Sequence, residues 1–268
     1  PRCYHASETS SATSSRGEYF FPVTTDVNDS RSGFQLSSYD MTTIGWGCAP
    51  EVQFKMNEEY PFMSGEFVWT GFDYLGEPTP YNKDLTNLLN FSDPNELEKA
   101  RKELEELSKI KTPSRSSYFG IVDLCGFPKD RYYNYKSYWR PDVPTVHILP
   151  HWKWQERIGE ITPVHIYTSG DAVELFLNGK SLGRREKAHS YDRLTWDDVR
   201  YEPGSLRAIA YKNGQKWAEE LVETTGKPAA LQVTAEKTEL KSDGTDLSFI
   251  RVAVVDSQGR VVPRSKNH

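Results

Sequence analysis

Two Asn-Gly pairs, Asn178-Gly179 and Asn213-Gly214, each separate short runs in which apolar and polar residues often alternate. Asn and Gly tolerate the positive φ angles of a two-residue hairpin turn, so each pair predicts two antiparallel strands. The predicted strands lie at Thr145–Leu149, Val164–Thr168, Val173–Leu177, Leu194–Val199, Leu206–Tyr211 and Trp217–Glu223. Six or seven short strands within about 80 residues predict an immunoglobulin-like β-sandwich.

The residues that precede this segment follow a different pattern. From residue 1 to about 142, short apolar segments alternate with helix-like stretches. Gly65–Tyr74 predicts a buried strand that leaves into a Gly- and Pro-rich loop. Strand, long loop and helix in succession are typical of a (β/α) barrel, whose catalytic loops follow the strands. This first region is therefore predicted to be α/β.

Two helices are predicted in the same region. The first covers Pro94–Lys111, with Asp93 as N-cap and apolar residues at helical spacing. Its alternating Glu-Lys and Arg-Glu pairs are typical of a solvated face, so we assign it a structural role. The second predicted helix is Asp130–Trp139.

The chain beyond residue 227 remains β-like, with Asp243-Gly244 as a turn and Phe249–Val255 as a strand. About 40 residues cannot close a sandwich of about 100 residues, so we expect the start of a further, truncated β-sandwich. The chain also begins at Pro1 without a recognisable leader. We therefore expect a piece of a longer polypeptide.

The composition excludes several classes of function. The chain has 33 basic and 38 acidic residues, for a net charge of −5, whereas nucleic-acid binding requires a basic excess. No apolar run approaches the roughly 18 residues of a membrane span, so no membrane contact is expected. Cys3, Cys48 and Cys125 make neither a disulfide framework nor a zinc site. His147 and His151 are about 13 Å apart in extended chain, too far for one ion, so we expect no metal and no cofactor.

The remaining candidates for chemistry are carboxylates. Retaining glycoside hydrolysis uses one carboxylate to attack the anomeric carbon and a second, about 5–5.5 Å away, to protonate the leaving oxygen. Glu8 lies among small polar residues that leave room for a substrate and are expected to donate hydrogen bonds to the carboxylate. Trp69 ends the Phe67-Val68 strand, where its ring is either a sugar-stacking surface or part of the core. Spacing does not rank nearby acids against Glu8, and these are Glu66, Asp73 and Glu77.

Several segments, in order along the chain, resemble one known family. They are residues 7–11 (SETSS), 15–19 (SRGEY), 65–81 (GEFVWTGFDYLGEPTPY), 114–120 (SRSSYFG), 123–130 (DLCGFPKD), 147–152 (HILPHW) and 173–180 (VELFLNGK). Together they resemble glycoside hydrolase family 2, in the form of the β-galactosidases of gut Bacteroidetes.

The resemblance implies a fold and a catalytic map. Residues 1–142 would be the C-terminal part of a (β/α)8 TIM barrel, 143–226 an immunoglobulin-like β-sandwich, and 227–268 the start of a second, truncated sandwich. The nucleophile of a retaining exo-glycosidase falls on Glu8, and the substrate-stacking Trp on Trp69. The family's general acid/base is a Glu preceded by Asn after the fourth barrel strand, which is absent from this chain. The chain by itself is therefore expected to be inactive.

The resemblance also implies a substrate, an oligosaccharide or other compound with a terminal β-galactoside. β-Glucuronidases and β-mannosidases share the architecture, so another family 2 specificity stays open. For a β-glucuronidase, Arg16 is the basic residue near Glu8 that would bind the uronate. A non-catalytic carbohydrate-binding or interaction module remains the alternative, supported by Trp152-Lys153-Trp154. A periplasmic or secreted location follows from the resemblance alone, and homo-oligomerisation stays open.

Overall fold

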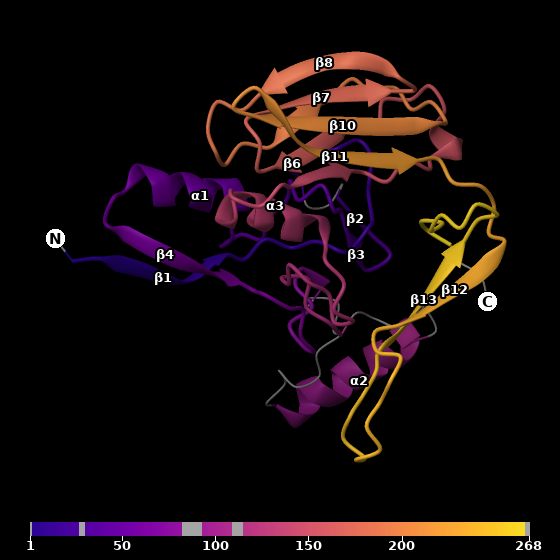
Figure 1. Ribbon diagram of the computed structural model, residues 1–268. Helices are drawn as coiled ribbons and strands as arrows, with labels where there is room; N and C mark the ends of the chain where they lie inside the picture. The colour runs from indigo at the N-terminus through magenta and orange to yellow at the C-terminus, as the bar shows by residue number, and fades with distance from the viewer. Residues whose placement is uncertain (1, 27–29, 82–92, 109–114, 266–268) are drawn as a thin grey trace.

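The computed structural model describes residues 2–26, 30–81, 93–108 and 115–265 (Figure 1). The first part contains two longer strands, β1 (Tyr4–Ser10) and β4 (Met63–Trp69), which pair in parallel. Helix α1 (Pro50–Glu59) connects them, after a small hairpin of β2 (Arg31–Ser32) and β3 (Gln35–Leu36). Parallel strands require such a crossover, so this part has the predicted α/β character. A β-α-β unit is common to barrels and to open α/β sheets.

The two faces of the β1–β4 sheet have different environments. Glu66 accepts hydrogen bonds from Asn57 on α1 and from Trp139 on α3 (Asp130–Trp139), so these helices cover one face. Side chains alternate along a strand, so Phe67 lies on the other face, where it is 63% exposed. We call this second face the open face of the β1–β4 sheet. The prediction of a buried strand here is wrong, because none of the seven residues of β4 is fully buried.

Both predicted helices are present. α3 covers the predicted residues, and α2 (Pro94–Ser108) begins at the predicted proline. The Asp93 carboxylate accepts a 2.7 Å hydrogen bond from the backbone N–H of Asn95, which is the predicted cap. The last three residues of the predicted helix, 109–111, lie outside the described residues.

Seven antiparallel strands follow, in two sheets that pack as a sandwich (Figure 1). The three-stranded sheet has the order β5 (Val146–Leu149), β6 (Val164–Thr168), β9 (Leu194–Trp196), and a short 3-10 helix, η3 (Gln155–Arg157), precedes β6. The four-stranded sheet has the order β11 (Gln215–Glu223), β10 (Ser205–Lys212), β7 (Ala172–Leu177), β8 (Lys180–Glu186). Sheets of four and three strands are the arrangement of constant-type immunoglobulin domains.

The two predicted hairpins are confirmed. Asn178 and Gly179 have φ values of 51° and 81°, and Asn213 and Gly214 have 52° and 78°, as a two-residue turn with two positive φ angles requires. The strand that follows the first turn, β8, was not assigned bounds from the sequence. Its residues are mostly exposed and charged, so it has little apolar signal.

One hydrophobic core joins the sandwich to the first part of the chain. Tyr19, which follows β1, and Tyr39, which follows β3, belong to the same buried cluster as Val173 and Leu175 of β7. Trp154 lies in this cluster too and is 2% exposed. Trp152 belongs to the same cluster and is 1% exposed. The binding-module alternative needs these two rings on the surface, so the structure contradicts it at this segment.

His147 and His151 both lie at this junction. His147 on β5 is 2.7 Å from Asp130 at the start of α3 and stacks on Tyr133, with ring centroids 3.8 Å apart. His151 stacks on Trp154 at 4.3 Å. Neither histidine belongs to a metal-type cluster in the described part of the chain.

The last described strands, β12 (Ala230–Ala235) and β13 (Ile250–Val255), form an antiparallel pair. Their apolar side chains are largely exposed, with Leu231 at 66% and Val252 at 58%. Across the parts of the chain that the structure describes, no helix has the length and apolar character needed to cross a membrane.

Candidate active site

Glu8 and Trp69 lie on the same face of two adjacent parallel strands. The register pairs Ser10 with Trp69 at the carboxyl ends of β1 and β4. Thr9 points towards the helices, because its hydroxyl donates a 2.8 Å hydrogen bond to Glu66. Alternation therefore directs Glu8 to the opposite face, which is also that of Trp69. An irregularity between Ala6 and Thr9 shifts the register, so that two residues of β1, Ser7 and Glu8, lie opposite Phe67 of β4.

The Glu8 side chain is exposed to solvent. Within the described residues its carboxylate makes no hydrogen bond or ion pair, although its neighbours were expected to donate to it. Their hydroxyls point elsewhere, since Thr9 donates to Glu66 and Ser10 donates to the Cys48 carbonyl at 2.9 Å. This expectation is therefore wrong for the described part of the chain.

Trp69 is half-buried and has a defined orientation. Its indole N–H donates a 3.1 Å hydrogen bond to the Tyr74 hydroxyl, and the peptide bond that follows it is cis. Burial, the hydrogen bond to Glu77 and the negative charge of Glu8 raise the pKa of Tyr74 above its usual range. Hydrogen bonds therefore link Trp69, Tyr74 and Glu77, and Glu8 lies close enough to act on Tyr74 through its charge.

The other nearby acids have structural partners. Glu66 lies on the helix-covered face, and burial raises its pKa. Asp73 forms a buried ion pair with Lys129 at 2.7 Å and accepts a 2.8 Å hydrogen bond from the Gly120 N–H. Geometry thus separates these acids from Glu8, because Glu66 lies on the helix-covered face, Asp73 is ion-paired and Glu77 accepts a hydrogen bond from Tyr74.

Two basic residues at the start of α3 fix the loops beyond β1 and β4. Arg131 pairs with Asp40 through distances of 2.6 and 2.8 Å, and both side chains are fully buried. The same guanidinium donates to the Ser14 hydroxyl and to the Phe119 carbonyl, each at 3.1 Å. The Lys129 ammonium donates to the Ser14 carbonyl at 2.7 Å.

The sequence analysis did not identify Lys129 and Arg131 as residues that hold these loops in place. The available signal was two cations at a helix N-terminus, a position that the helix dipole makes unfavourable. Such residues need compensating partners, and here Asp40 and Asp73 provide them.

A groove of about 660 Å³ lies beside these loops. Ser14 and Asp73, each four residues beyond the end of its strand, line it together with Arg16. The Arg16 guanidinium is already paired with Asp123 at 2.7 Å and lies 4.7 Å from the Phe127 ring centroid. The groove adjoins the carboxyl ends of the strands, where α/β proteins bind ligands.

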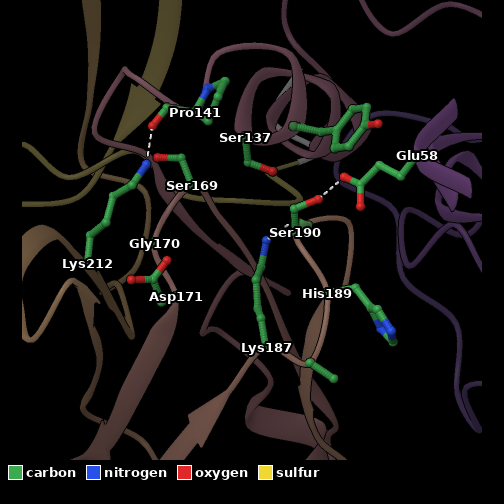
Figure 2. A pocket seen from close by; sticks show the side chains of 12 residues that line it. Glu58, Ser137, Pro141, Ser169, Gly170, Asp171, Lys187, His189, Ser190 and Lys212 are labelled. Carbon is green, nitrogen blue, oxygen red and sulfur yellow. Dashed lines mark hydrogen bonds between the residues drawn. The ribbon is translucent and has the colours of Figure 1, made fainter. Parts of the chain in front are cut away.

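A second hollow, of about 470 Å³, lies between the first part of the chain and the sandwich (Figure 2). Its lysines are engaged, since Lys187 donates to the carbonyls of Thr168 and Ser190 at 2.7 and 2.8 Å, and Lys212 donates to that of Pro141. Burial lowers the pKa of Lys187 to about 8. None of the candidate carboxylates lines this hollow, which we assign to packing between the two parts.

Comparison with known proteins gives matches along most of the chain. Residues 231–268 match glycoside hydrolase family 2 C-terminal domain 5, and residues 159–218 match a domain of unknown function, DUF4982. The β-galactosidase BoGH2A of Bacteroides ovatus is 38% identical over 97% of this chain and 28% of its own length. A putative β-glucuronidase of Formosa agariphila is 30% identical over 86% of this chain and 20% of its own length.

Comparison of the fold with solved structures also gives a glycosidase. The crystal structure of a β-glycosidase from Bacteroides vulgatus superposes with a TM-score of 0.75 at 27% identity, over 97% of this chain and 32% of that one. The chain belongs to glycoside hydrolase family 2. It spans less than a third of the length of these relatives.

Proposed function

We propose that this chain is part of a retaining exo-β-galactosidase in which Glu8 is the nucleophile and Trp69 supports the sugar. The observation that supports this most is the placement of both side chains on the open face of β1 and β4, at the end where α/β barrels build active sites. The likeness to the Bacteroides ovatus β-galactosidase, across nearly the whole chain, supports the same sugar.

In the proposed reaction, a carboxylate oxygen of Glu8 attacks the anomeric carbon of the terminal galactoside. The bond to the leaving oxygen breaks, and that oxygen takes a proton from an acid outside this chain. The result is a galactosyl ester on Glu8. Water, deprotonated by the same partner residue, then releases galactose with retention of configuration. Exposure of Glu8 and its lack of an ion pair within the described residues leave the carboxylate available for attack.

We further propose that β1 and β4 are neighbouring strands of a TIM barrel, and that the exposed Phe67 face is covered when the other strands are present. Two parallel strands with helices on one face only leave apolar surface and strand edges uncovered. The domain limits proposed are 1–142 for the barrel part, 143–226 for the sandwich and 227–268 for the further β-sandwich. The core that joins Tyr19 and Tyr39 to the sandwich supports tight packing across the first limit.

A β-glucuronidase is the second candidate, since three relatives are named as β-glucuronidases or putative β-glucuronidases. It would need a cation free to bind the uronate carboxylate. Arg16 is the candidate on sequence grounds, but its guanidinium is paired with Asp123. The pairing favours a neutral sugar.

Covalent labelling tests the nucleophile. The full-length enzyme that contains this chain would be incubated with 2,4-dinitrophenyl 2-deoxy-2-fluoro-β-galactoside, which traps the ester, and then digested for mass spectrometry. The label is expected on the peptide that contains Glu8, and it should be lost in Glu8→Gln. Glu58→Gln, at the far end of α1, is the matched control and should label normally. A label on another carboxylate, with Glu8→Gln still reactive, would contradict the proposal.

A further inference from the structure

Trp69 is the first member of a directed chain of hydrogen bonds. Its indole N–H donates to the Tyr74 hydroxyl at 3.1 Å, and that hydroxyl donates in turn to the Glu77 carboxylate. A tyrosine hydroxyl has one proton, so it can accept from Trp69 and donate to Glu77 at the same time. The Trp69 and Tyr74 rings also pack edge to face, with centroids 5.9 Å apart and planes at 80°. Both contacts act on the orientation of the indole ring.

The backbone around Tyr74 is fixed independently of the ring. The Ser117 N–H donates to the Tyr74 carbonyl at 2.8 Å, and the Tyr74 N–H donates to the Ser117 hydroxyl at 3.1 Å. Ser117 is 2% exposed, so this link is shielded from water. Gly76 and Glu77 then have φ values of 96° and 43°, which turn the chain so that the Glu77 side chain meets Tyr74. A left-handed conformation at a glutamate is uncommon and indicates that local contacts impose it.

The electrostatic surroundings of Tyr74 keep its hydroxyl protonated. Burial, the bond to Glu77 and the charge of Glu8 all raise the pKa of Tyr74. The hydroxyl therefore stays protonated over the working range of a glycosidase and keeps donating to Glu77. The tyrosine does not act as a proton donor to Glu8, because its proton is directed elsewhere.

We infer that Tyr74 and Glu77 are positioning residues that hold the Trp69 ring at the angle at which it stacks on the sugar, an inference that rests on the proposed function. A ring held in place before binding loses less freedom when the sugar binds, so the effect falls on substrate affinity. The bond-making step at Glu8 does not use either residue. The two residues should therefore affect KM more than kcat.

The test uses the full-length enzyme and 4-nitrophenyl β-galactoside. Tyr74→Phe removes only the hydroxyl, and KM is expected to rise about three- to tenfold, the effect of one hydrogen bond, with kcat within about twofold of wild type. Glu77→Ala should behave in the same way. Glu77→Gln keeps an acceptor oxygen and should restore KM. Leu75→Ala, in the same loop and 78% exposed, is the matched control.

The outcomes separate this inference from the proposed function. An unchanged KM in Tyr74→Phe, or equal effects of Glu77→Gln and Glu77→Ala, overturns the positioning role while the fluorosugar still labels Glu8. Loss of kcat with an unchanged KM also overturns it. A wild-type enzyme that neither labels at Glu8 nor turns over the galactoside overturns the proposed function, and this inference with it.

Discussion

The Thr9 hydroxyl donates a 2.8 Å hydrogen bond to Glu66 and so ties β1 to β4 one residue beyond the proposed nucleophile. The other Glu66 oxygen accepts from Asn57 at 3.1 Å and from Trp139 at 3.3 Å. Two strands and two helices therefore meet at one carboxylate behind the open face. This contact lies next to Glu8 along the chain, and Glu66 itself faces the helices.

Glu66 is expected to make stability depend on pH. Burial raises its pKa, so the native state binds a proton more tightly than the unfolded chain does. The stability that this tighter proton binding contributes is present below the ordinary pKa of about 4.5. It is lost as the pH rises through the raised pKa of Glu66. Glu66→Gln should therefore become more stable relative to wild type between about pH 4 and 7. Urea unfolding across this range measures the difference, and a difference that does not vary with pH would contradict the prediction.

Asp40 is expected to be essential for stability because it neutralises Arg131. Burial alone would lower the pKa of Arg131, but the charge and hydrogen bonds of Asp40 raise it. Asp40→Ala leaves an unpaired buried cation and should destabilise the protein by about 3–5 kcal/mol. Asp142→Ala breaks the exposed pair with Arg140 and is the control, with no measurable change expected. Equal unfolding midpoints for the two variants would exclude this role.

His147 is expected to stabilise the junction between α3 and the sandwich in its charged form. Burial by itself lowers its pKa, but hydrogen bonds to Asp130 and Glu220 outweigh burial and raise the pKa to about 9. The contribution of charged His147 to the free energy of unfolding is therefore complete below the ordinary pKa of 6.5. It is lost as the pH rises through about 9. His147→Gln should abolish this loss, measured by urea unfolding from pH 6 to 9.5.

His151 provides the control for that experiment. Burial lowers its pKa to about 4, so its contribution is lost only at acid pH. His151→Gln should keep the wild-type profile between pH 6.5 and 9. A profile flattened as much as that of His147→Gln would show that the link to Asp130 and Glu220 is not the cause.

Trp154 is expected to act in folding rather than in glycan binding. Truncating an aromatic side chain that is 2% exposed to alanine should cost about 3–5 kcal/mol. Trp46→Ala, at 67% exposure, should leave stability unchanged. Trp154→Phe retains most of the core volume and separates folding from binding. Loss of galactan retention by a well-folded Trp154→Phe would restore the binding-module alternative.

We expect the isolated 268-residue chain to be inactive on an aryl β-galactoside and the full-length enzyme to turn it over. Acid–base catalysis supplies about 10²–10⁴-fold, and the proposed acid is outside this chain. A fluorogenic galactoside assay of the purified chain measures the residual rate. Saturable turnover that Glu8→Gln abolishes would show that the chain contains its own acid.

Local signals in the sequence accounted for much of the fold. The Asn-Gly turns, the Asp93 cap and the limits of α3 depend on φ preferences and on contacts between near neighbours, so they could be predicted. β8 was not assigned because an exposed, charged edge strand has almost no apolar pattern. Burial of β4 was predicted wrongly because an apolar run does not reveal which of its faces is covered.

The candidate site divides in the same way. Residue chemistry and family resemblance point to Glu8 and Trp69, and both are properties of short segments of the chain. Their placement on one face and the ion pairs of Arg131 and Lys129 join residues as far as 91 positions apart. Such contacts form only when the strands are in register and the helices are packed, because pairing over that distance depends on the whole fold and not on local preference.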